Sequence, residues 1–210
     1  ENLARFGKDY ASDAQFYKYL YTDNPFKQNR CDYYALRQAD RMTSIGYNIY
    51  CRFMLGHLNI AGLYLGGWRK LPQSSLPGSA YTFLKAIQSS PISGSYRPSA
   101  QAQGLFKGKF WKKIKVFSFH YEIKSRDFKP RRLLKEVSIQ EYDRYPQAMD
   151  PLTEDVNRQY PFSIWRGPQL YQWRYDQYPL ASTKYLLLFR NNQLEGYLVF
   201  LYTHKKGFIS

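Results

Sequence analysis

The sequence has 210 residues, of which 44% are hydrophobic and 19% aromatic, so it can bury a core and we expect a globular protein. Its 31 Lys and Arg residues against 16 Asp and Glu residues give a formal net charge of +15. That charge attracts nucleic acid, phosphate-bearing cofactors, anionic lipid head groups or acidic proteins, without choosing among them. No apolar run approaches the roughly 18 residues that span a bilayer, which excludes a transmembrane helix.

The first third of the sequence predicts a helix followed by three antiparallel strands. Ser12 to Gln15 has the form of a capping box, and Asn24-Pro25 ends the helix near Thr22 because the residue before a proline disfavours helical geometry. Strands are predicted over 32–37, 44–54 and 58–68, with a polar turn over 38–43 and a second turn at Gly56. The many Tyr and Phe residues favour such an antiparallel-rich sheet.

A loop rich in small residues and prolines, Arg69 to Gly78, follows the third strand and leads into a helix predicted over 79–88. A strand, a loop with free amides and a helix N-terminus together form an anion-binding site, because the free N–H groups and the helix dipole attract negative charge. Joints of this kind are common, so a purely structural role stays open.

The middle of the chain is strongly basic. Residues 91–96 predict a short strand, 97–108 a helix opened by Arg97-Pro98, and 110–124 a long strand of alternating apolar and polar residues. The basic excess runs from Lys107 to Lys135. Residues 126–149 carry charge and prolines but little periodicity, which predicts a linker.

The last part of the chain predicts two helices and a hairpin. Asp150-Pro151 has the form of a helix N-cap with proline behind it, giving a helix to about Tyr160, and Gly167-Pro168 opens another. A hairpin of strands over 184–190 and 194–202 follows, and Asn191-Asn192 tolerate the left-handed conformation of its tight turn. Residues 208–210 look like the start of a further strand.

The two cysteines, Cys31 and Cys51, fall in or beside predicted strands, and no spacing of Cys and His is typical of a disulfide framework or a metal site. We therefore expect reduced core cysteines, no metal, and a cytoplasmic protein. No signal peptide is visible, although the chain does not begin with Met and its true start can lie upstream.

The segment Tyr171 to Tyr202 repeats a pattern from the start of the chain. Aromatic residues and a proline recur at the same spacing in YKYLYTDNP (17–25) and YQWRYDQYP (171–179). Each set precedes an apolar strand, a polar turn and a Gly-Tyr pair, Gly46-Tyr47 or Gly196-Tyr197. We interpret this as a duplicated unit, with two unrelated aromatic amphipathic helices as the alternative.

The order of elements resembles that of the GCN5-related N-acetyltransferase (GNAT) family. Two sequence patterns also resemble that family, "WRY…P…Y.LL…EGYLV" at 173–199 and "YLYTDNPF…YYALRQ…SIGY" at 19–47. The resemblance is to members with tandem units. It implies an α/β (α+β) fold, with a mixed, mostly antiparallel GNAT-like sheet flanked by helices. The units would be 1–125 and a partial second copy at 150–210, joined by the linker 126–149, with the second cofactor loop beyond Ser210.

The resemblance also implies a function: transfer of an acyl group, in the first place acetyl, from acetyl-CoA or another acyl-CoA to an amine. In that family the loop after the long fourth strand holds the pyrophosphate with backbone amides, and no metal is needed. The matching cofactor-binding residues are Arg69, Lys70, Gln73, Ser74, Ser75, Gly78 and Ser79, with amides of Leu63 to Trp68 at the thioester. The candidate catalytic residues are Tyr96, His120 and Glu122, with His57 as a further candidate base.

The sequence departs from the sequence pattern of the family at two positions that matter for the chemistry. Pro77 has no N–H to offer a phosphate, and Phe106 stands where the family commonly has a tyrosine that protonates the leaving thiolate. A catalytically degenerate, GNAT-like binding protein is therefore one alternative. Tandem units are also what a resemblance to Fem-type aminoacyltransferases, which use charged tRNA, would imply.

The basic segment Lys107 to Lys135 supports two further alternatives. Its interleaved Lys and aromatic residues suit a nucleic-acid or tRNA-binding module that contacts RNA phosphates and stacks on bases. Alternation puts Phe117, Phe119 and Tyr121 on one face, which favours a core role for these rings instead. The same segment would also suit docking of an acidic carrier protein.

Overall fold

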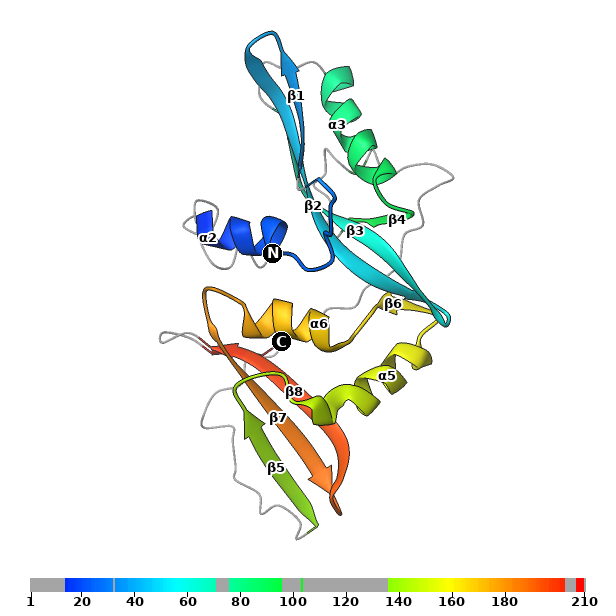
Figure 1. Ribbon diagram of the computed structural model, residues 1–210, viewed down its shortest axis with the longest axis vertical. Coiled ribbons are helices and arrows are strands. Elements are labelled where there is room, and N and C mark those ends of the chain that lie inside the picture. The colour runs from blue at the N-terminus through cyan, green and yellow to red at the C-terminus, as the bar shows by residue number, and fades with distance from the viewer. Residues whose placement is uncertain are drawn as a thin grey trace.

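The computed structural model describes residues 14–31, 33–70, 76–95, 103, 136–202 and 207–209 (Figure 1). They form an α+β fold of two sheets, one five-stranded and one four-stranded, with helices α2 and α6 lying between them. The first sheet is mixed and mostly antiparallel and the second is antiparallel throughout, which confirms the predicted α+β class with a mostly antiparallel sheet. Within the described ranges no helix is long and apolar enough to cross a membrane.

The first sheet is built around its longest strand, β2 (Arg41–Leu55). β1 (Tyr33–Gln38) and β3 (Leu58–Lys70) flank it in antiparallel pairing, and β4 (Ile92–Gly94) adds to β3 in parallel. The predicted turn over 38–43 is shorter than expected, because Gln38 already pairs with Arg41. Ala39, with φ of 51°, and Asp40 make the turn, so β2 extends through polar residues that the apolar pattern did not mark.

The second half of the chain contributes one more strand to the first sheet. β6 (Phe162–Ile164) pairs with the last residues of β2, where Phe53 faces Ile164. Backbone hydrogen bonds extend the contact on both sides, from Gly56 N to Pro161 O at 2.8 Å and from Trp165 N to Arg52 O at 2.8 Å. The two halves of the sequence therefore share a sheet.

Helix α3 (Leu76–Gln88) lies along β1 and β2 (Figure 1). It buries Phe83 and Ala86, and the hydroxyls of Ser44 and Thr82 form a buried hydrogen bond of 3.1 Å. The helix begins at Leu76 rather than at the predicted Ser79. Pro77 falls in its first turn, where a proline is tolerated because the N–H that it lacks would have no intrahelical acceptor.

The second sheet consists of β5 (Val137–Tyr142), β7 (Ser182–Arg190), β8 (Gln193–Tyr202) and β9 (Gly207–Ile209), all antiparallel. The predicted linker over 126–149 is wrong for Val137–Tyr142, which pairs with β7 along its whole length. The alternation in this segment is weak, and its strand conformation depends on pairing with the long apolar β7. Residues 126–135 lie outside the described ones.

The turn between β7 and β8 confirms the prediction made for Asn191 and Asn192. Their φ angles are 49° and 64°, the left-handed conformation that an Asn-Asn turn tolerates.

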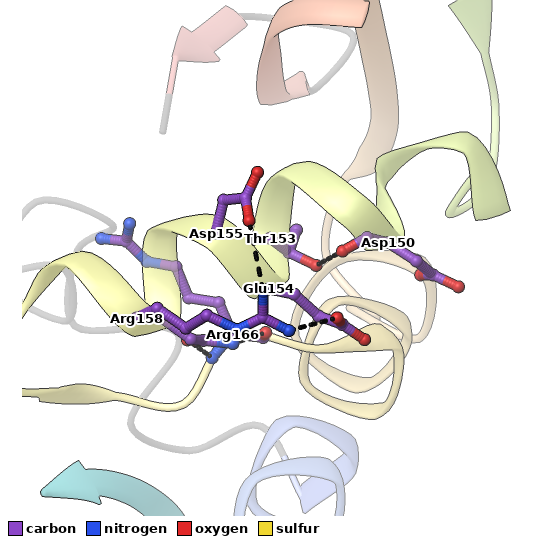
Figure 2. Close-up of polar contacts among 7 residues, drawn as sticks. Asp150, Thr153, Glu154, Asp155, Arg158 and Arg166 are labelled. Atoms are coloured by element: carbon purple, nitrogen blue, oxygen red, sulfur yellow. Dashed lines mark hydrogen bonds and ion pairs between the residues drawn. The ribbon is translucent and has the colours of Figure 1, made fainter. Parts of the chain in front are cut away.

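The helices of the second half begin close to their predicted positions. A 3₁₀ turn, η5 (Gln147–Met149), leads into α5 (Asp150–Gln159), so Met149 rather than Asp150 occupies the N-cap. α6 (Pro168–Tyr171) follows Gly167 and continues as a π-helix, η6 (Gln172–Asp176). On the exposed side of α5, Arg158 reaches Glu154 at 3.2 Å and Asp155 at 3.6 Å (Figure 2).

The repeat seen in the sequence has a structural counterpart. At the start of the chain α2 (Ala14–Tyr17) also passes into a π-helix, η2 (Lys18–Thr22). Its closing bond, Asp23 N to Lys18 O at 2.8 Å, matches Gln177 N to Gln172 O at 2.9 Å. In each helix two tyrosines stack four residues apart, with ring centroids 5.6 Å apart for Tyr17–Tyr21 and 5.7 Å apart for Tyr171–Tyr175. These matches support the duplicated unit.

The two repeated helices pack against each other in a shared core. The rings of Tyr19 and Trp173 stack with centroids 5.5 Å apart. Trp173 Nε1 donates to Tyr19 O at 3.1 Å, and the Tyr19 hydroxyl donates to Arg174 O at 3.2 Å. The buried cluster around them combines Phe26, Tyr50 and Leu63 of the first half with Leu170 of the second. The halves are thus packed as one body.

Asn157 ties α5 to the segment that precedes α6. Its side chain is 5% exposed, donates through Nδ2 to Arg166 O, and accepts from Arg166 N at 2.7 Å. We expect Asn157→Ala to lower the free energy of unfolding by about 1–3 kcal/mol, because the peptide of Arg166 loses both partners. Urea unfolding followed by circular dichroism measures the loss. Arg158→Ala on the same helix is the control, since its exposed ion pairs contribute about 0.3–0.5 kcal/mol; an equal loss in both variants would contradict the prediction.

Candidate functional site

The candidate site lies where β3 and β4 part. The two strands run parallel, are joined through α3, and pair over Gly62 to Tyr64 with Ile92 to Gly94. β3 continues to Lys70, paired with β2 on one side only. On its other side, from Leu65 onward, no strand among the described residues pairs with it. Alternate N–H and C=O groups of this stretch point toward that side, where no described strand offers them a ladder partner.

The cofactor-binding residues predicted from the sequence converge on this place in part. Arg69 and Lys70 are the last two residues of β3, and Gly78 and Ser79 lie in the first turn of α3. The N–H groups of the first three residues of a helix have no intrahelical acceptor, so the backbone of Gly78 has a donor to offer, whereas Pro77 has none and the N–H of Ser79 stands where the intrahelical hydrogen bonds begin. Gln73, Ser74 and Ser75 lie outside the described residues.

The predicted catalytic residues Tyr96, His120 and Glu122 also lie outside the described residues, as does the position of Phe106. His57 is described, and it does not belong to this site. It is exposed in the turn between β2 and β3, at the opposite end of β3 from Lys70. β3 has 13 residues, and at about 3.3 Å per residue the two ends are about 40 Å apart.

Tyr64 is a candidate that the sequence analysis missed. It is the last residue of β3 that pairs with β4, opposite Gly94. Burial raises the pKa of its phenol to about 12, and the nearby Cys51 thiol adds to the increase. Tyr64 is therefore protonated at neutral pH and can donate a proton or a hydrogen bond. Only the parting of the two strands, a long-range feature, distinguishes it from the other tyrosines.

Gly62 allows β3 and β4 to approach beneath the ring of Phe53. A Cβ at Gly62 would lie 2.3 Å from two atoms of that ring and 3.0 Å from Ile92 O. Phe53 is 2% exposed and has little room to move. We expect Gly62→Ala to cost about 1–3 kcal/mol through overpacking, measured by thermal unfolding. Gly196→Ala in β8 is the matched control, because nothing lies within 4 Å of its Cβ position; equal stability of the two variants would contradict the prediction.

The described residues contain no group of three or more His, Cys, Asp or Glu side chains that could hold a metal ion. Both cysteines are free thiols. Cys51 is buried, as predicted for a core residue, and burial raises its pKa to about 12. The prediction is wrong for Cys31, which is exposed, because the residues around it form a loop before β1 and not a strand.

The sequence was compared with protein families and with curated proteins. No family model matches the chain, and no curated protein matches it.

Proposed function

We propose that this chain is a GNAT-type N-acyltransferase unit that moves an acyl group, in the first place acetyl, from a CoA thioester to an amine. The observation that carries the proposal is the β3–α3–β4 unit, a parallel strand pair in a mostly antiparallel sheet, in which the end of β3 has no second neighbour among the described strands and leads toward a helix N-terminus. Ligands of α/β units bind at such carboxyl ends of parallel strands, where helix N-termini attract phosphate.

Each part of the reaction has candidate residues. Arg69 and Lys70, with the amide of Gly78, would neutralise the diphosphate, and Gln73, Ser74, Ser75 and Ser79 would complete that site. Amides on the free edge of β3, from Leu65 to Trp68, would polarise the thioester carbonyl. The bound acyl-CoA supplies the activated acyl group.

Proton transfer needs an acid for the leaving thiolate and a base for the ammonium of the acceptor. Tyr64 is our candidate acid, because its phenol is protonated and lies where the strands part. Tyr96, His120 and Glu122 remain the candidate bases.

Calorimetric titration with acetyl-CoA tests the proposal. We expect saturable binding that weakens at least tenfold in the Arg69→Gln/Lys70→Gln double variant. Lys85→Gln is the control, since Lys85 lies in the last turn of α3, away from the free amides. For Tyr64→Phe we expect lower turnover with unchanged acetyl-CoA affinity.

The outcomes separate the alternatives. Binding of acetyl-CoA without turnover for a panel of amines would identify a binding-only protein. No binding at millimolar acetyl-CoA, together with salt-sensitive binding of single-stranded RNA, would refute the proposal in favour of a nucleic-acid-binding module. An acidic carrier protein would instead bind through the Lys107 to Lys135 segment.

A further inference from the structure

A small cavity of about 60 Å³ lies where the loop after η2 meets β2. Residues of that loop, of β2 and β3, and Gln169 of α6 line it, and its charged residues are Arg30 and Arg52. Among the described residues neither guanidinium has a carboxylate partner. Two positively charged residues therefore line one cavity, and no described carboxylate pairs with either of them.

The loop that carries Arg30 is held at both ends by buried hydrogen bonds. Asn24, 4% exposed, donates through Nδ2 to Tyr50 O at 2.9 Å and accepts from Phe26 N at 2.9 Å. At the other end the hydroxyl of Tyr50 donates to Cys31 O at 2.8 Å. The position of Arg30 is thus fixed by the fold before any ligand binds.

Arg30 has a donor that no described residue satisfies. Its Nη1 atom is buried and has no hydrogen-bond partner there, while the guanidinium carbon lies 5.2 Å from the centroid of the Tyr50 ring. A buried, charged N–H without an acceptor is costly, and such groups usually indicate a missing water or ion. Because Arg30 lines the cavity, an acceptor bound there would lie beside this guanidinium.

Arg52 is oriented by Asn59 on the neighbouring strand. Its Nε donates to Asn59 Oδ1 at 2.6 Å and its Nη2 to Asn59 O at 3.2 Å. These bonds fix the plane of the guanidinium and leave further N–H donors unused. The cavity volume of 60 Å³ is several times the roughly 10–15 Å³ that one water needs. We infer that the cavity is a binding site for a small tetrahedral oxyanion of the phosphate class, bound between Arg30 and Arg52.

The cavity and the site proposed for acyl-CoA lie on the same strand, since Ala61, which lines the cavity, precedes Tyr64 by three residues and Lys70 by nine, about 10 Å and about 30 Å along the strand. They use different cations, Arg30 and Arg52 here and Arg69 and Lys70 there, so variants of Arg30 and Arg52 test the cavity separately from acyl transfer. The sequence alone does not predict this cavity. Arg30 and Arg52 line it together only because Asn24 and Tyr50 hold the loop of Arg30 against β2.

Titration with inorganic phosphate at constant ionic strength, read by calorimetry and thermal shift, tests the inference. We expect saturable binding and a rise in Tm. Arg30→Gln and Arg52→Gln should each weaken phosphate binding at least tenfold. Arg158→Gln is the matched control, since Arg158 is exposed and already paired with Glu154 and Asp155 (Figure 2), and it should bind as the parent does.

Three outcomes would overturn the inference. Equal stabilisation of the parent and of the Arg30 and Arg52 variants would mean that phosphate acts on the basic surface as a whole. Binding of acetate without phosphate would exclude the tetrahedral class. A crystal of the parent protein soaked in selenate gives a test that does not depend on whether the variants fold. Selenium scatters anomalously, so a bound selenate should give an anomalous difference peak between the two arginines. Ordered water alone at that place would refute the site.

Discussion

Alkaline titration should unfold this protein cooperatively within about two to three pH units above pH 10. Burial is the main cause that raises the pKa of six described tyrosine phenols above their ordinary value. The increase is largest for four of them, and hydrogen bonds to Asp150, Tyr197 and Asp176 add to it for three of these four. The four residues are Tyr19, Tyr145, Tyr171 and Tyr185, which are at most 9% exposed.

The sign of the effect follows from proton counts. In the unfolded chain these phenols lose their protons near pH 10, whereas in the folded protein they keep them. The contribution of these phenols to the free energy of unfolding is therefore complete below pH 10. It falls as the pH rises, by at most about 1.4 kcal/mol per pH unit for each tyrosine. Four such residues exhaust a typical stability of about 5–15 kcal/mol over a few pH units.

Circular dichroism and tyrosinate absorbance, recorded on the same samples, measure this transition. Tyr171→Phe removes one buried phenol and should reduce the slope of the unfolding free energy against pH by up to about 1.4 kcal/mol per pH unit. The exposed Tyr160→Phe controls for the substitution itself. Ionisation of the four buried tyrosines at pH 12, while the circular dichroism is still that of the native protein, would contradict the prediction.

Replacing Trp173 by Ala should lower the free energy of unfolding by about 3–5 kcal/mol. The indole is 5% exposed, stacks on Tyr19, and belongs to the core cluster that contains residues of both halves. The substitution leaves a cavity at this junction and leaves the carbonyl of Tyr19 without its indole donor. Urea unfolding measures the loss.

Trp173→Phe separates the two contributions. It keeps an aromatic ring against Tyr19 but loses the Nε1 donor, so we expect a cost of about 1–2 kcal/mol from the hydrogen bond plus a smaller packing loss. Because the halves share a core and a sheet, unfolding should remain a single transition in the parent. Two separate transitions in the parent, or a loss below about 1 kcal/mol in Trp173→Ala, would contradict the shared core.

Features with a local cause could be predicted from the sequence. Asn191-Asn192 fixes its turn through residues that tolerate positive φ, and Gly167-Pro168 marks a helix start through its own backbone preferences. The order of a strand followed by a helix around Arg69 and Gly78 was likewise predicted, since β3 ends at Lys70 and α3 begins at Leu76. In each case the information lies within a few residues.

Features that depend on distant partners could not be predicted. The sequence of β5 predicts part of a linker, because its strand conformation comes from pairing with β7 more than forty residues later. β6 has three residues and forms only against the end of β2. The same limit applies to function, since Arg30 and Arg52 share a cavity only because the fold brings their loop and strand together.

The contact between the repeated helices has a consequence for the origin of the molecule. Each of the paired rings, Tyr19 and Trp173, donates one hydrogen bond to the backbone of the opposite helix. A surface that binds an equivalent copy of itself is the defining property of a two-fold symmetric homodimer. We expect that an ancestral single unit associated through this helix, and that gene fusion made the association permanent. The two paired positions hold different aromatic residues, Tyr19 and Trp173, as two sides of an interface that change separately within one chain allow.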